Sequence, residues 1–150
     1  ELVLIGSDRN PYYDGLIEYY NKYKMHNDGY KQVHFLYNVP RQHIYTYVKK
    51  AYAYIMTSKW EAYPISLIEA MAAGVPWIST NVGIVKYLPG GFVADEISDI
   101  SYWIEFIAKN EKTSQSLGNV GKVYAGTQFK INKKVDQIEN VILKAVKKEK

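Results

Sequence analysis

The sequence predicts an α/β fold in which a parallel sheet is covered by helices on both faces. Two observations support this class. Short apolar runs typical of strands alternate with stretches of about 10–15 residues in which apolar positions recur at helical spacing. The first run, Leu2–Ile5, is continuously apolar and ends at Gly6, as expected for a strand buried on both faces. Such sheets bind ligands at the carboxyl ends of their strands, so the loops there are candidate sites.

The first half of the chain begins this alternation. Leu16, Ile17 and Tyr20 recur at helical spacing after the first strand, and the turn-forming run Asn27-Asp28-Gly29 ends that helix. The second strand is followed by the turn Asn38-Val39-Pro40. We expect strands at Leu2–Ile5, Val33–Tyr37 and Ala53–Thr57, and helices at about Tyr12–Tyr23 and Arg41–Lys50.

The second half continues the same order. Ser98 is a candidate N-cap, because its hydroxyl can accept a hydrogen bond from a free backbone N–H. The last helix carries an apolar stripe that includes Val135, Ile138 and Ile142. We expect strands at Pro76–Thr80 and Phe92–Ala94, a short element at Val85–Leu88, and helices at Pro64–Ala73, Ile100–Ala108, Ser114–Ala125 and Lys133–Lys148. No internal boundary interrupts the pattern, so we expect one Rossmann-like, three-layer α/β/α domain over residues 1–150.

Composition narrows the function classes. A hydrophobic fraction of 47% and a charged fraction of 23% are typical of a globular protein, and no apolar run is long enough for a membrane span. The absence of cysteine excludes disulfides and thiolate sites and fits a reducing compartment, so we expect a cytoplasmic location. Much of the net charge of +4 comes from lysines of the last helix, which could contact anionic lipids at the inner membrane face. The tyrosines are not interleaved with a basic stripe, so we expect no nucleic-acid binding.

The stretch Ser58–Gly83 is the one around which the rest of the chain is organised. Pro64 suits the first helical position, and Gly74 followed by Pro76 ends the helix. Glu69 falls at the border of the buried face, where a carboxylate is neither buried nor free in solvent. The apolar arc expected to face the sheet consists of Leu67, Ile68, Met71 and Ala72.

Two carboxylates flank the start of this helix. The backbone N–H groups of Ile65 and Ser66 would form an anion site suited to phosphate. Glu69 lies between about one and two turns further on, where it can accept hydrogen bonds from a vicinal diol such as ribose. Glu61, in the loop before the helix, would reach sugar hydroxyls. Taken singly, each glutamate is an ordinary surface residue. The spacing of the pair and the run P-x4-E-A-M-A-x-G-x-P favour the order sugar, diphosphate, ribose.

This segment resembles the C-terminal, donor-binding domain of retaining glycosyltransferases with the GT-B fold, of the group 1 or family 4 type. The resemblance is carried by the E-x7-E signature, formed here by Glu61 and Glu69, and by the run LIEAMAAGVPWISTNVG. It extends more weakly over nearly all 150 residues, through ELVLIG, VHFLYNVP and AYIMTSKWEAYP. It implies one half of a GT-B fold, in a longer chain whose N-terminal domain binds the acceptor.

The resemblance also implies roles for particular residues. Glu61, the candidate catalytic residue, would contact the donor sugar, and Glu69 would bind the ribose hydroxyls. The other donor-binding candidates are Tyr63, Pro64, Ile65 and Ser66 at the diphosphate, Asn38 and Val39 at the base, and Ser58, Thr80 and Gly83 along the same cleft. Ala62 stands where the family often has glycine. Ile84-Val85-Lys86-Tyr87 replaces the glycine and glutamate that usually follow Gly83, and the basic pair that neutralises the leaving diphosphate is absent from this chain.

The expected reaction transfers a glycosyl group from a nucleoside diphosphate sugar, such as a UDP- or GDP-sugar, to an acceptor in polysaccharide, lipid or other glycan biosynthesis. Helix N–H groups and cations can stabilise the leaving diphosphate without a metal. The sequence has no D-x-D motif and its three histidines, His26, His34 and His43, are spread out, so we expect no metal and no cofactor. By resemblance, the anomeric configuration is retained. We expect the isolated chain to bind the donor without turning it over.

Two other interpretations remain open. A GT-B-type epimerase or phosphorylase would keep the fold but make less use of the Glu61 and Glu69 pair. A non-catalytic nucleotide-binding or interaction module would fit the abrupt start at ELVLIG. A classical dinucleotide enzyme is disfavoured, because GSDRNP rather than G-x-G-x-x-G follows the first strand.

Overall fold

The computed structural model describes residues 1–25 and 31–148. Its internal contacts divide the chain into two units, Glu1–Tyr47 and Val48–Lys150. Each unit has its own sheet of parallel strands with helices packed against it, so the predicted α/β class is confirmed. The predicted break at Asn27-Asp28-Gly29 lies outside the described residues, and a single donor-binding domain over residues 1–150 stays a prediction.

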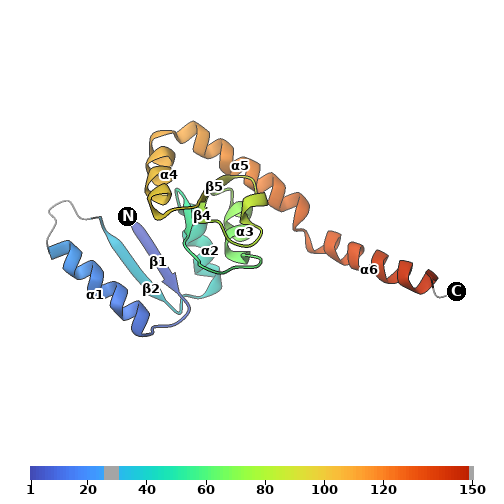
Figure 1. Ribbon diagram of the computed structural model, residues 1–150, viewed down its shortest axis with the longest axis horizontal. Helices are drawn as coiled ribbons and strands as arrows, with labels where there is room; N and C mark the ends of the chain where they lie inside the picture. The colour runs from blue at the N-terminus through green and yellow to red at the C-terminus, as the bar shows by residue number, and fades with distance from the viewer. Residues whose placement is uncertain (26–30, 149–150) are drawn as a thin grey trace. The chain divides into compact units, whose positions relative to one another are not determined.

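The first unit contains a two-stranded parallel sheet and one long helix. β1 (Leu2–Gly6) pairs with β2 (Val33–Tyr37) along its whole length, and α1 (Pro11–Met25) lies between them in the sequence (Figure 1). Tyr13 of α1 is buried, and its ring meets Phe35 and Tyr37 edge-on, with ring centroids 5.9 and 6.0 Å away. α2 (Arg41–Lys50), whose predicted bounds are confirmed, crosses the boundary between the two units.

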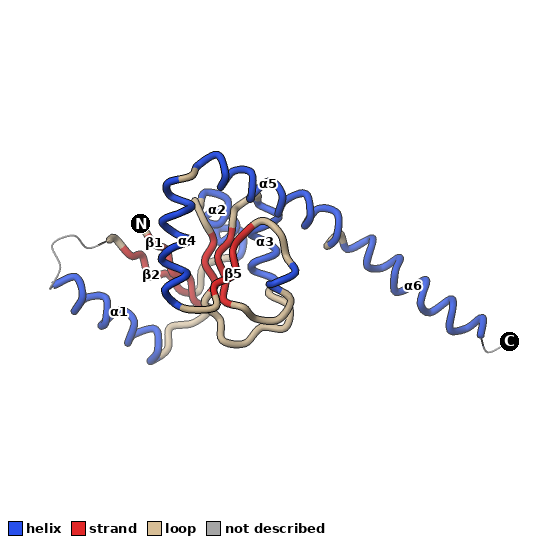
Figure 2. The backbone as a smooth tube through the Cα atoms, turned by 45° about the horizontal axis from the view of Figure 1, so that its top comes forward, coloured by secondary structure: helices blue, strands red, loops and turns tan. Residues whose placement is uncertain are grey.

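The second unit is built on a three-stranded parallel sheet in the order β3-β4-β5. Its strands are β3 (Tyr54–Met56), β4 (Trp77–Thr80) and β5 (Gly91–Ala94). Because side chains alternate along a strand, Trp77 and Ile78 point to opposite faces. Trp77 packs in a core cluster with residues of α3 (Ile65–Ala73). On the other face Phe92, paired with Ile78, stacks on Trp103 of α4 (Ile97–Lys109), with centroids 3.9 Å apart. Figure 2 accordingly shows the strands between α3 and α4, as the three-layer prediction requires.

α5 (Glu111–Gln128) packs closely on α3 because small residues meet where the two helices touch. A Cβ added at Gly118 would lie 2.1 Å from the carbonyl oxygen of Gly74, so only glycine fits there. Gly74 has a φ of 80°, which is the left-handed stop predicted for the central helix. The core beside these helices contains the buried side chains of Leu67, Met71, Trp77 and Val85, the last from the short 3-10 turn η1 (Val85–Tyr87).

α6 (Ile131–Lys148) ends the described chain and has the amphipathic pattern that the sequence predicts. Four apolar side chains of its stripe are each more than half exposed: Ile131, Val135, Ile138 and Ile142. The helix begins two residues before the predicted Lys133.

Two details of the central helix differ from prediction. Pro64 is the N-cap of α3 rather than its first residue, since its ψ of 95° is extended backbone. Ala72 is exposed, whereas Ala70 is fully buried. The predicted arc faces the sheet alone, but α5 also packs against α3 and shifts the buried arc toward Ala70.

The start of α4 also differs from prediction. Glu96, and not Ser98, is the N-cap, and it forms a capping box with Asp99. The Glu96 side chain accepts the backbone N–H of Asp99, while the Asp99 carboxylate accepts the N–H of Glu96 at 2.9 Å. Ser98 therefore lies inside the first turn, where its hydroxyl is not needed as a cap.

Candidate functional site

The Glu61 carboxylate is held at the ends of two neighbouring strands. The Ser58 hydroxyl, just after β3, donates a hydrogen bond of 3.0 Å to Oε1 of Glu61. The Thr80 hydroxyl, at the end of β4, donates to the carbonyl oxygen of Ser58 at 2.6 Å. Glu61 is half-buried. The structure therefore brings together three of the predicted site residues at the carboxyl edge of the sheet.

Gly83 allows the loop after β4 to lie in close contact with the loop that carries Glu61. Its φ of 53° lies in the left-handed region, and an added Cβ would lie 2.3 Å from the carbonyl oxygen of Glu61 and 2.5 Å from that of Ala62. The loop after β4 thus touches the peptide that carries Glu61. Ala62 itself is exposed, so the methyl group that replaces the family's glycine has room.

The start of α3 is the position at which the sequence predicts an anion site. Pro64 is buried and is the N-cap residue, and the first turn receives no cap hydrogen bond from its side chain. The next two residues, Ile65 and Ser66, are exposed. The N–H groups of a first helical turn carry a partial positive charge and have no partner within the helix, so they suit a phosphate.

Tyr54, which sequence reasoning missed, lies close to both carboxylates and to the start of α3. Burial raises the pKa of its phenol, the charges of Glu61 and Glu69 raise it further, and a side-chain hydrogen bond with Ser66 opposes them. Glu69 is half-buried, as predicted from its place on the helix. The pKa of one phenol is therefore raised by the charges of both Glu61 and Glu69.

Tyr63, a predicted diphosphate contact, has an aromatic partner far along the chain. Its ring meets the ring of Phe129 edge-on, with centroids 5.8 Å apart. Phe129 follows the last residue of α5 and also meets Tyr124 edge-on at 5.7 Å. Nothing in the sequence links residues 63 and 129, so this support for the turn could not be predicted.

The predicted base contacts lie in the other unit. Asn38 has a φ of 51°, and its N–H is shared between the carbonyl oxygens of Gly6 and Ser7 at 3.3 and 3.2 Å. This places Asn38 and Val39 at the carboxyl ends of β1 and β2. Asn38 and Val39 belong to the first unit and Glu61 to the second, and the contact of these two residues with a base stays a prediction.

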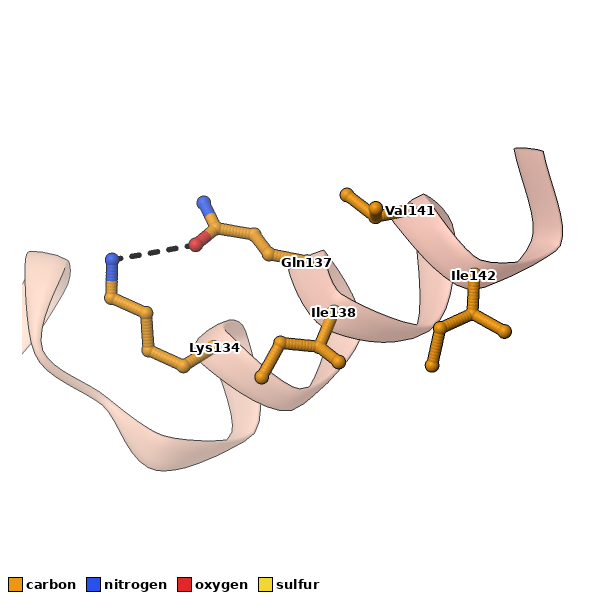
Figure 3. Close-up of a pocket in the computed structure, with 5 residues that line it drawn as sticks. All are labelled: Lys134, Gln137, Ile138, Val141 and Ile142. Atoms are coloured by element: carbon orange, nitrogen blue, oxygen red, sulfur yellow. Dashed lines mark hydrogen bonds between the residues drawn. The ribbon is translucent and has the colours of Figure 1, made fainter. Parts of the chain in front are cut away.

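Two apolar hollows lie elsewhere on the described part of the chain. A shallow apolar hollow lies on α6, lined by Lys134, Gln137, Ile138, Val141 and Ile142 (Figure 3). A second hollow lies between α1 and its sheet in the first unit. Within residues 1–25 and 31–148, no group of three or more metal-ligating side chains is present and no helix is long and apolar enough to cross a membrane. Metal independence and contact with a membrane surface stay predictions.

Comparison with known proteins gives one family and a set of similar folds, two of which are described here. The sequence matches the family described as glycosyl transferases group 1 over residues 1–123. No curated protein matches it. Sucrose-phosphate synthase from Thermosynechococcus elongatus has a TM-score of 0.77 at 22% identity, over 96% of this chain and 39% of that one. HepE of Anabaena, solved in complex with UDP-glucose, has a TM-score of 0.77 at 17% identity, over 95% of this chain and 40% of that one.

The chain thus spans about two-fifths of the length of these two structures. At these identities the structural matches show the fold alone, and that fold is the Rossmann-like arrangement of GT-B proteins. The family match covers more than half of the sequence and confirms the resemblance. The roles of Glu61 and Glu69 as an E-x7-E pair stay predictions. On the strength of the family match, the chain belongs to the group 1 glycosyl transferases.

Proposed function

We propose that this chain binds a nucleoside diphosphate sugar and presents it for transfer of the sugar to an acceptor. The observation that carries the proposal is the Glu61 carboxylate, which is held by a hydrogen bond from Ser58 in the loop just before α3. Ser58, Thr80 and Gly83 fix the loop, and the helix start has backbone N–H groups for a diphosphate. The family supplies the class of reaction, and the UDP-glucose bound by HepE supports the class of donor.

Each part of the donor has a proposed partner. Glu61 contacts the sugar, the turn from Tyr63 to Ser66 binds the diphosphate, and Glu69 accepts hydrogen bonds from the ribose hydroxyls. A carboxylate accepts two such bonds at once, which suits a vicinal diol. Thr80 and Gly83 line the sugar side, while Asn38 and Val39 face the base.

The transfer is proposed to proceed with retention and without a metal. Charge that develops on the leaving diphosphate is stabilised by the N–H groups and dipole of α3, because these groups are already oriented toward the anion. The proposed donor contacts all lie within these 150 residues, so donor binding is the property to measure on them. Addition of a chelator is expected to leave donor affinity unchanged.

The test is calorimetric titration with UDP, GDP and ADP and with their glucose derivatives. We expect one nucleotide series to bind and Glu69→Ala to weaken it by at least about tenfold, since a charged hydrogen-bond acceptor is lost. Glu139→Ala, an exposed mid-helix glutamate on α6, is the matched control and should leave the affinity unchanged. Equal binding by Glu69→Ala and wild type would remove Glu69 from the site, and no binding of any nucleotide would contradict the proposed function.

A further inference from the structure

The turn proposed to bind the diphosphate is supported by a residue at the opposite end of the unit's sequence. Tyr63, one residue before the N-cap of α3, has its ring against the edge of Phe129. Phe129 is half-buried and packs in turn on Tyr124 and on the core cluster that contains Leu67. A row of three rings therefore connects the diphosphate turn to the end of α5.

The turn from Tyr63 to Ser66 is restrained by its neighbours in the chain as well as by the three rings. The carbonyl of Glu61 is already fixed by Gly83, and Pro64 is locked by its ring and by burial. Tyr63 lies between these two residues in the chain, is 45% exposed, and meets the ring of Phe129 edge-on. Edge-to-face ring contacts are directional, and they therefore restrain the orientation of Tyr63 as well as its position.

We propose that Phe129 is a positioning residue for the diphosphate subsite, acting through Tyr63. The proposal rests on the proposed function and adds a residue that touches no part of the donor. Phe129 keeps the peptide groups from Tyr63 to Ser66 in the arrangement that receives the diphosphate. Base and ribose contacts do not depend on it.

The test compares a nucleoside diphosphate with its monophosphate. For the nucleotide series that binds wild type, the ratio of the two affinities measures the diphosphate subsite. We expect Phe129→Ala to lower the preference for the diphosphate by about three- to tenfold, the range of one ring contact, with little change in monophosphate affinity. Phe129→Tyr retains the ring and should restore the preference. Phe129→Leu keeps the apolar volume but removes the ring. If the alanine variant unfolds, the leucine variant replaces it in this comparison, with the same expected loss of preference.

A matched control separates positioning from general loss of stability. Phe106 is also half-buried and meets Phe92 and Trp103 edge-on, but on the face of the sheet that α4 covers. Phe106→Ala should lower the unfolding temperature as Phe129→Ala does and leave the preference for the diphosphate unchanged. An equal loss of preference in both variants would contradict the proposal.

A double-mutant cycle tests whether Tyr63 is the intermediary. If Phe129 acts through the Tyr63 ring, the double variant should show the same loss of preference as Tyr63→Ala alone, because the contact between the two rings can be lost only once. Additive losses would contradict the proposal. Nucleotide binding by wild type with an undiminished preference in Phe129→Ala would overturn this inference alone, whereas no binding by wild type would overturn it together with the proposed function.

Discussion

At the scale of single residues, the site depends on the fit between two loops that follow adjacent strands. The carbonyl of Glu61 lies where a side chain at position 83 would have to go, and the Ser58 peptide is held by Thr80. Neither contact involves a charged group, yet both determine where the Glu61 carboxylate lies. Small backbone changes in this loop should therefore alter the site as strongly as removal of Glu61.

Gly83→Ala is expected to destabilise the chain by about 1–3 kcal/mol, because a Cβ would clash with two carbonyl oxygens and the φ of 53° disfavours a side chain. Urea unfolding followed by circular dichroism measures this. Gly126→Ala, in the interior of α5 with nothing within 4 Å of the added Cβ, should instead gain about 0.5–1 kcal/mol. Equal effects of the two substitutions would show that the contact between the loops is not formed.

Tyr54 makes the site sensitive to alkaline pH. Its pKa is raised from the ordinary value of about 10 by burial and by the charges of Glu61 and Glu69, so the folded state disfavours the phenolate. The stability that the neutral phenol contributes is fully present below pH of about 10 and is lost as pH rises through the raised pKa. Replacing both glutamates by glutamine should lower the pKa of Tyr54, measured as the tyrosinate absorbance that Tyr54→Phe removes. An unchanged pKa of Tyr54 in this variant would show that the charges of the two carboxylates do not act on the phenol.

Helix periodicity could place Glu69 at the border of the buried face, because it acts over a few residues, whereas Glu61 and Gly83 were singled out by their motif and by the family resemblance. Tyr54 and Phe129 could not be identified in this way. Their importance comes from contacts across 12 and 66 positions, those of Tyr54 with Ser66 and of Phe129 with Tyr63. Such contacts are decided by how strands and helices pack, which local spacing does not encode.

At the scale of elements, the helix ends show which local signals suffice. Gly74 was identified correctly because the left-handed conformation is easiest for glycine and the signal lies in one residue. The start of α4 was misplaced because three successive candidates, Glu96, Ser98 and Asp99, can each cap a helix. The buried arc of α3 was shifted because its second neighbour, α5, begins 38 residues after α3 ends (position 111 against 73).

Two substitutions at the start of α4 compare the observed capping box of Glu96 and Asp99 with the predicted cap at Ser98. Asp99→Ala removes the acceptor for the N–H groups of Glu96 and Asp95, at 2.9 and 3.0 Å, and should cost about 1 kcal/mol. Ser98→Ala, at the position first assigned as the cap, should change the free energy of unfolding by less than about 0.5 kcal/mol. Denaturant unfolding of both variants is the measurement. A larger loss of unfolding free energy in Ser98→Ala than in Asp99→Ala would show that Ser98 is the cap.

At the scale of the whole molecule, the two units differ in how much they bury. Among the described residues of Glu1–Tyr47, only Tyr13 is buried, and its hydroxyl lacks a hydrogen-bond partner. In Val48–Lys150 several large side chains, including Leu67, Trp77 and Ile78, are almost completely inaccessible. The sequence correctly predicted the strands of both units, but the prediction that Leu2–Ile5 is buried on both faces is wrong, because Leu2 and Val3 are exposed. Apolar runs indicate that a strand can be buried without showing how much of the fold covers it.

Hydrogen exchange should therefore distinguish the two sheets. The amide of Ile78 lies in β4, the central strand between β3 and β5, whereas that of Leu4 lies in β1, which pairs only with β2 in the described structure. Opening a segment with little buried surface costs less free energy, so its amides exchange through more frequent local opening. We expect Leu4 to exchange at least about tenfold faster than Ile78, measured peptide by peptide by mass spectrometry. Equal protection at the two positions would mean that both sheets unfold as one cooperative unit, in agreement with a single domain over residues 1–150.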